Sequence, residues 1–388
     1  FVLIEKGLAS IPEADAMFAK PMGMPGTAIF GLADFVGNDT IDHIAVNSYE
    51  LLTKDEYREI YNVPSFFKQM IEKKMYGNKT KDAGGFYLSG RGADGKKFKK
   101  VLDIKTLQHV DYDRKATFPQ VEATKELKTT AEKQKYLFKN NEFAKKLMSS
   151  MVVYSANRIP EITDTLVDLD NGMKWGYAWE FGPFEIWDNL GLKDSIADIE
   201  AAGFTIPANV KRMIEKGGTT FYRIENGLKQ YWDFASDSYK NVPYSPSMVF
   251  LSNIKADKSK VVLGNDACSL VDIGDGVFCF EFHTKMNALN NDVINTVPKV
   301  VEFVKKNGAG LVVGNEAGGI PPAFSAGGDL KYMLKLAKAG DFKGINDFIA
   351  DVHNGMKMIK YAPFPVVAAP FGLALGGGCE VCLWSDKI

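Results

Sequence analysis

The sequence predicts a multidomain protein in which a mainly α-helical tandem-repeat region precedes an α/β domain. Its 388 residues exceed the roughly 100 to 200 of one ordinary domain. A helical pattern occurs twice before residue 256, and short apolar runs then alternate with helix-length segments. We therefore expect four segments, at residues 1–124, 125–150, 151–255 and 256–388.

The helical region is predicted from an internal repeat. The stretch IFGLADFVG at 29–37 matches PFEIWDNLG at 183–191, with Phe, Asp and Gly at equivalent positions. In the same order, VPSFFKQMIEK at 63–73 matches IPANVKRMIEK at 206–216. Each copy then reaches a Phe-Tyr pair, at 86–87 and at 221–222. We expect two similar helical units in tandem that share a core.

A Lys-rich segment at 125–146 joins the two copies. We interpret it as a connecting helix with a solvated face. A phosphate-binding patch is the alternative, because lysines that bind phosphate gather on one surface.

The α/β domain is predicted from about Lys258 onward. Apolar runs at 269–273 and 277–282 flank Gly-Asp-Gly, which indicates a hairpin. Further strand-like runs at 310–314 and 365–369 are separated by segments with helical periodicity. Helical crossovers of this length connect strands that lie side by side in parallel.

Composition and charge exclude several classes of partner. The net charge of −1 provides no overall attraction to nucleic acid. The apolar run at 364–383 contains two prolines, three consecutive glycines and Glu380, which a membrane-spanning helix tolerates poorly. We expect no nucleic-acid partner and no membrane span.

The two ends of the chain lack the usual signals. The opening FVLIEKGLAS has neither a methionine nor the basic start and cleavage pattern of a signal peptide, and the chain stops at SDKI. We expect both ends to be cut and the protein to be cytoplasmic.

Some motifs are expected to mislead. GRGADG at 90–95 has the spacing of a dinucleotide fingerprint, but the strand-like KKFKKVLD follows it instead of a helix, so we predict a hairpin turn. DLDNG at 168–172 resembles a calcium loop without its later ligands, and we predict a helix-terminating turn.

No metal site is expected. Cys379 and Cys382 form a CxxC without a second pair, so we interpret both as small buried side chains. The four histidines lack an acidic or nucleophilic partner in a recognisable arrangement, and we assign structural or surface roles to all of them: His43, His109, His283 and His353.

The chemistry is expected at two glycine-rich turns, each of which follows a strand and opens a helix. In FGLALGGGCE at 371–380, the helix start offers unpaired N–H groups, and Glu380 lies one turn beyond Gly377. In AFSAGGDL at 323–330, Gly328 presents bare backbone in the same way. Two such N–H groups aimed at one oxygen would stabilise an enolate or oxyanion, and Glu380 would move the proton.

With these residues and KMNALN at 285–290, the sequence from Lys258 to the end resembles the crotonase (enoyl-CoA hydratase/isomerase) superfamily, whose fold is a ββα spiral. The resemblance implies that Gly328 and Gly377 donate N–H groups to an acyl-CoA thioester. Glu380 would match the first of the family's two catalytic glutamates, and Ala326 would lie against the CoA adenine. The family often has alanine in place of Gly328. Its second glutamate would lie past Ile388, so we expect a partial domain.

The first two thirds resembles the C-terminal region of 3-hydroxyacyl-CoA dehydrogenases. The matching stretches are IFGLADFVGNDT, the run from 63 to 87, and FGPFEIWDNLG with Asn157-Arg158 before it. The resemblance implies a doubled helical domain like the C-terminal domain of 6-phosphogluconate dehydrogenase. In that family NAD and a catalytic His-Glu pair belong to a preceding Rossmann domain, which we expect to be missing here. We interpret Asn157 as structural.

Together the two resemblances imply a bifunctional enzyme of fatty-acid β-oxidation, in a bacterial setting. It would hydrate trans-2-enoyl-CoA and oxidise the resulting 3-hydroxyacyl-CoA with NAD, and this chain alone would do neither. A crotonase-type isomerase and a non-catalytic acyl-CoA-binding module are the alternatives. The expected partners are acyl-CoA substrates, with self-association or a thiolase partner as further alternatives.

Overall fold

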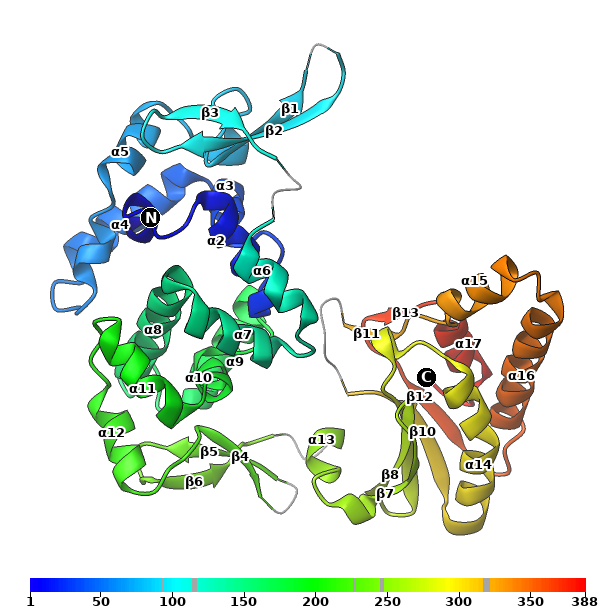
Figure 1. Ribbon diagram of the computed structural model, residues 1–388. Coiled ribbons are helices and arrows are strands. Elements are labelled where there is room, and N and C mark those ends of the chain that lie inside the picture. Colours follow the sequence, from blue (N-terminus) through cyan, green and yellow to red (C-terminus); the bar gives the residue numbers. More distant parts are fainter. Residues whose placement is uncertain (93, 114–116, 226–227, 245–247, 317–321) are drawn as a thin grey trace. The chain divides into compact units, whose positions relative to one another are not determined.

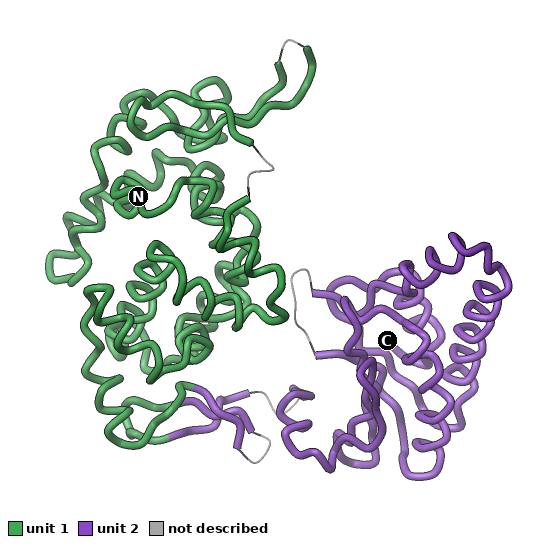
Figure 2. Tube along the Cα trace, viewed as in Figure 1, with its two compact units in different colours: residues 1–221, 232–238 green, residues 222–231, 239–388 purple. Residues whose placement is uncertain are grey.

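The computed structural model describes residues 1–388 except 93, 114–116, 226–227, 245–247 and 317–321. The chain forms two compact units, shown in different colours in Figure 2. The first comprises residues 1–221 and 232–238, and the second comprises residues 222–231 and 239–388.

The first copy of the repeat consists of short helices followed by a small antiparallel sheet with strand order β1-β2-β3 (Figure 1). Its helices are α1 (Val2–Glu5), α2 (Ile11–Met17), α3 (Phe30–Val36), α4 (Asn38–Leu51) and α5 (Ser65–Glu72). Its strands are β1 (Tyr87–Arg91), β2 (Lys97–Asp103) and β3 (Gln108–Asp111).

The second copy follows the same order. Before it come α6 (Pro119–Ala123), α7 (Thr130–Asn140) and α8 (Glu142–Asn157). Its helices are α9 (Leu166–Tyr177), α10 (Pro183–Leu190), α11 (Leu192–Ala201) and α12 (Ala208–Glu215). Its strands are β4 (Tyr222–Glu225), β5 (Leu228–Asp233) and β6 (Ser238–Asn241).

The equivalent aspartates of the repeat, Asp34 and Asp188, make the same hydrogen bond in both copies. Asp34 accepts a hydrogen bond from the Phe86 N–H at 2.8 Å, and Asp188 accepts one from the Phe221 N–H at the same distance. Each carboxylate thereby pairs a backbone donor at the edge of the small sheet, which burial would otherwise leave without a partner. The repeat predicted from the sequence is therefore a structural repeat.

The helices α3 and α10 differ in what covers them. Leu32 and Val36 are 38% and 41% exposed, whereas the equivalent Ile186 and Leu190 are fully buried. In the second copy α7 and α8 pack against α10, and the apolar face is removed from water. The Lys-rich segment supplies this cover as two helices rather than one.

The GRGADG stretch joins two antiparallel strands, because β1 and β2 pair with Arg91 opposite Lys97. Its residue 93 lies outside the described residues. The DLDNG interpretation is wrong: Asp168 lies in the first turn of α9, which Thr165 caps by accepting a hydrogen bond from the Asp168 N–H.

The second unit is built on a five-stranded sheet of order β12-β10-β9-β8-β7, in which β9, β10 and β12 run parallel. Its strands are β7 (Val261–Gly264), β8 (Cys268–Gly274), β9 (Val277–Phe282), β10 (Gly310–Gly314) and β12 (Val366–Ala369). The helices α14 (Asn291–Asn307) and α16 (Phe342–Lys360) pack against the apolar face formed by Phe278, Phe280 and Phe282 (Figure 1). The short helix α13 (Leu251–Ile254) contacts the other face.

A second, two-stranded sheet positions the glycine turns. Its strands are β11 (Ala323–Ser325) and β13 (Leu373–Ala374), which run parallel. Helix α15 (Leu330–Lys338) follows the first strand and α17 (Gly377–Trp384) follows the second. Both turns therefore lie at the same end of one small sheet.

Candidate active site

The two glycine turns meet. The Leu375 N–H donates to the Ser325 carbonyl at 2.9 Å, which continues the pairing of β11 and β13 into the turns. A Cβ atom built on Gly377 would lie 3.5 Å from the Gly328 nitrogen. The backbone nitrogens of the two predicted donors are thus close neighbours, although 49 positions separate them in the sequence.

The Gly328 N–H is left without an acceptor in the part of the chain that the structure describes. Leu289 forms a parallel bridge with Gly328 by donating to the Gly327 carbonyl at 2.8 Å and accepting from the Asp329 N–H at 3.1 Å. In a parallel bridge these flanking peptides make the bonds, so the N–H of the bridged residue points away from the partner. Gly328 therefore turns its N–H away from Leu289.

The Gly377 N–H is also unpaired among the described residues. Gly377 is the first residue of α17, where an N–H has no partner within the helix. Its neighbours are paired, since Gly378 donates to Leu375 at 2.9 Å and Glu380 donates to Gly376 at 3.0 Å. Two adjacent unpaired donors, one of them at the positive end of a helix dipole, favour negative charge on an oxygen placed between them.

The turns require glycine at positions next to the two donors, where a Cβ atom would clash with the backbone or with a side chain. Gly327 has φ +90°, and a Cβ atom there would lie 2.6 Å from the Leu375 carbonyl oxygen. A Cβ atom on Gly378 would lie 2.6 Å from that of Ser325, whereas one on Gly328 would meet nothing within 4 Å. The sequence pattern alone does not separate these roles, because they depend on the contact between the turns.

Glu380 lies in the first turn of α17, three residues beyond Gly377. Its side chain is exposed and has no hydrogen bond or ion pair with any described residue. A carboxylate in this state is available to exchange a proton with a bound molecule.

Ala326 directly precedes the first glycine pair. Its N–H donates to the Met286 carbonyl at 3.0 Å, and the Asn287 amide donates to the Ala323 carbonyl at 2.9 Å. Met286 and Asn287 both have positive φ, near +55°. The KMNALN stretch is therefore a tight turn that holds β11, a role that its sequence alone did not reveal.

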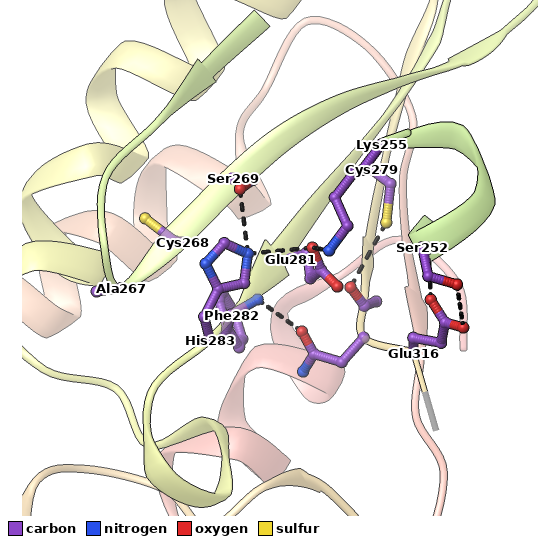
Figure 3. A network of polar contacts seen from close by, with 12 residues as sticks. Ser252, Lys255, Ala267, Cys268, Ser269, Cys279, Glu281, Phe282, His283 and Glu316 are labelled. Atoms are coloured by element: carbon purple, nitrogen blue, oxygen red, sulfur yellow. Dashed lines mark hydrogen bonds and ion pairs between the residues drawn. The ribbon is translucent and has the colours of Figure 1, made fainter. Parts of the chain in front are cut away.

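A separate polar network lies on the side of the sheet that contacts α13 (Figure 3). Glu281 is buried, and its carboxylate accepts from Lys255 at 2.6 Å and lies 3.1 Å from His283 Nε2. The same nitrogen lies 3.1 Å from Ser269 Oγ. A nucleophilic triad requires both ring nitrogens of the histidine, so this serine, histidine and glutamate do not form one.

Two other predicted residues can be placed. The Asn157 amide donates to Glu56 at 3.0 Å, which agrees with a structural role. Cys382 is buried as predicted, but Cys379 is exposed, because it occupies the outer side of α17. Both are free thiols.

Among the described residues, no group of three or more His, Cys, Asp or Glu side chains could hold a metal ion. No helix in this part of the chain is long and apolar enough to cross a membrane.

Comparison with known families matches two separate parts of the chain. Residues 1–88 match the 3-hydroxyacyl-CoA dehydrogenase C-terminal domain, and residues 276–385 match the enoyl-CoA hydratase/isomerase family. The helical first region and the crotonase-type second region predicted from the sequence are therefore confirmed.

Similar proteins include a probable 3-hydroxyacyl-CoA dehydrogenase of Bacillus subtilis, which is 37% identical over 99% of this chain and 47% of its own length. A putative fatty acid oxidation complex trifunctional enzyme of Rickettsia felis is 29% identical over 96% of this chain and 47% of its own length. A solved enoyl-CoA hydratase from Shewanella pealeana is 27% identical, with a TM-score of 0.28, over 31% of this chain and 44% of that one. The chain spans about half the length of the curated relatives that it matches.

Proposed function

We propose that this chain, which joins a 3-hydroxyacyl-CoA dehydrogenase C-terminal domain to an enoyl-CoA hydratase/isomerase domain, is part of a fatty-acid oxidation enzyme with two consecutive activities. The first adds water to trans-2-enoyl-CoA. The second oxidises the 3-hydroxyacyl-CoA product to 3-ketoacyl-CoA. The names of the bacterial relatives support this assignment. We place the enzyme in the bacterial cytoplasm, with self-association or a thiolase as candidate partners.

One observation carries the hydratase proposal: two unpaired N–H groups, from Gly328 and Gly377, lie close together, and the exposed carboxylate of Glu380 follows the second by one helical turn. When water attacks C3 of an enoyl thioester, negative charge moves to the thioester oxygen. Hydrogen bonds from both glycines to that oxygen strengthen as the charge develops, and each such donor contributes about 3 kcal/mol of transition-state stabilisation. Ala326, just before this hole, is the proposed neighbour of the CoA adenine.

Glu380 acts as the acid–base group in this proposal. Lying one turn beyond Gly377, it takes the proton from the attacking water and makes the oxygen nucleophilic. The α-carbon then takes up a proton to complete the product. The group that delivers this second proton is not assigned to a residue of this chain.

The oxidation requires NAD, which accepts a hydride from the 3-hydroxy carbon. The described residues do not fit that cofactor, because GRGADG connects two antiparallel strands and no helix follows to bind a pyrophosphate. The family match is to the C-terminal domain of the dehydrogenase. We therefore assign no step of the oxidation to this chain.

The test is Glu380→Gln in the full-length protein, with hydration of trans-2-enoyl-CoA as the assay. The amide cannot accept the proton, so we expect kcat to fall about 10²- to 10⁴-fold with little change in KM. Glu302→Gln, an exposed change on α14, is the matched control, and the dehydrogenase activity of the same preparation reports on folding. Unchanged hydration would remove Glu380 from the mechanism. Migration of the double bond without uptake of water would favour an isomerase, and binding without turnover in the wild type would favour an acyl-CoA-binding module.

A further inference from the structure

The strand that precedes the first donor, β11, makes few backbone hydrogen bonds to its neighbours. β11 has three residues and pairs with the two-residue β13 rather than with the five-stranded sheet. A strand this short has few ladder bonds to hold its position. Side chains from neighbouring segments supply further links.

Asn315 provides a link between the two sheets. It follows β10, and its Oδ1 accepts from the Phe282 N–H at 2.6 Å at the end of β9. Its Nδ2 donates to the Phe324 carbonyl at 2.6 Å in the middle of β11. The orientation of the amide follows from its partners, because an N–H requires an acceptor and a carbonyl requires a donor.

The link continues to the first donor within four residues. Next to Phe324, the Ser325 hydroxyl donates to the Asn287 carbonyl at 2.7 Å and accepts from the Gly327 N–H at 3.1 Å. Gly328 comes directly after. A displacement of β11 would therefore move the Gly328 N–H relative to the Gly377 N–H.

The residue after Asn315, Glu316, is also held in place by hydrogen bonds. Glu316 accepts from the Ser252 N–H at 2.6 Å and from the Ser252 hydroxyl at 2.8 Å, at the start of α13 (Figure 3). Hydrogen bonds thus connect the segment 314–316 to α13 through Glu316 and to β9 and β11 through Asn315.

We infer that Asn315 is a positioning residue for the proposed oxyanion hole: it fixes β11 so that the Gly328 and Gly377 N–H groups face one oxygen. This rests on the proposed function. Asn315 itself touches neither the thioester nor the transferred protons. Its contribution lies in geometry, and displacements of about 1 Å in such a site can cost about 10²-fold in rate.

The experiment replaces Asn315 in the full-length protein. Asn315→Ala removes both hydrogen bonds, and Asn315→Asp keeps the acceptor for Phe282 but loses the donor to Phe324. We expect kcat and kcat/KM for hydration to fall about 10- to 100-fold in both variants, with the dehydrogenase activity unchanged. Asn307→Ala is the control, because Asn307 makes the same type of bond, to the Phe303 carbonyl at 2.9 Å, at an exposed helix end.

A spectroscopic measurement separates positioning from simple stabilisation. A bound 3-aryl-2-enoyl-CoA absorbs at longer wavelength when hydrogen bonds polarise its thioester carbonyl. We expect this shift to shrink in Asn315→Ala and Asn315→Asp and to persist in Asn307→Ala. A lower melting temperature with an unchanged shift and unchanged kcat would overturn the inference.

Two further cases need their own interpretation: a variant that does not fold, and a wild-type protein without hydratase activity. If Asn315→Ala does not fold, Glu316→Gln is the replacement variant, because it weakens the same segment more mildly. The inference then predicts a smaller decrease in both kcat and the absorption shift. No decrease in either quantity would contradict it. If the wild-type protein does not hydrate enoyl-CoA, the proposed function fails. A shift that still depends on Asn315 would then support its positioning role alone.

Discussion

The two glycine turns place similar donors by different means. In each, a glycine that cannot carry a side chain lies next to the donor: Gly327 before Gly328, and Gly378 after Gly377. The first donor depends on contacts with distant segments, through the Leu289 bridge and Asn315. The second is the first N–H of α17, which any helix leaves unpaired. The first donor should therefore be sensitive to remote changes, and the second mainly to changes at its own position.

The largest expected effect comes from removing the second donor. Proline is well accepted at the first position of a helix, so Gly377→Pro deletes the N–H while α17 can still form. We expect hydration kcat in the full-length protein to fall about 10²- to 10³-fold relative to Gly377→Ala, which keeps the N–H. Both variants place a Cβ atom 3.2 Å from Leu289 Cδ1, so their ratio removes the effect of that contact and reports the replacement of the N–H by the proline ring. Equal activity of the two variants would show that the Gly377 N–H does not bind the reacting oxygen.

The next effect is a difference in stability between replacing a glycine that the turn conformation requires and replacing a proposed donor glycine. Gly327→Ala forces a side chain into a positive φ and against the Leu375 carbonyl, so we expect about 1–3 kcal/mol of destabilisation. Gly328→Ala enters open space and should change the unfolding free energy by less than about 0.5 kcal/mol. Denaturant unfolding of the 388-residue chain, followed by circular dichroism, measures both. Similar losses in the two variants would contradict the separation of roles.

Much of this arrangement could be predicted from sequence because it is local. Apolar periodicity located β10 residue by residue and β12 to within one residue, and the strand-glycine-helix order identified both turns. The DLDNG error was avoidable, since Thr165 three residues before Asp168 is an ordinary helix-start signal.

Other features depend on contacts between distant segments and carry no local signal. Asn315 is an ordinary polar residue after a strand until β11 lies across the end of β9. Gly327 is distinguished from Gly328 only by the approach of Leu375. The exposure of Cys379 depends on which side of α17 faces the sheet. Sequence reasoning therefore located the two glycine turns and Glu380, whose catalytic roles stay predictions, but not the residues that hold the turns in place.

The smallest expected effect is a pH-dependent loss of stability when Glu281, which lies near the segment that supports the first turn, is replaced. Burial alone would raise the pKa of Glu281, but hydrogen bonds from His283 and Lys255 outweigh it and hold this pKa below its usual value. The folded-state pKa is therefore lower than the unfolded one, so the interaction stabilises the fold above the unfolded value of 4.5 and is lost as pH falls through the folded value. We expect Glu281→Gln to lower the unfolding free energy on the order of 1 kcal/mol at pH 7 and progressively less toward pH 3. Urea unfolding of both proteins across this range measures the difference. A difference that does not depend on pH would mean that packing, rather than the charge of Glu281, holds α13 to the sheet beside the segment that carries Asn315.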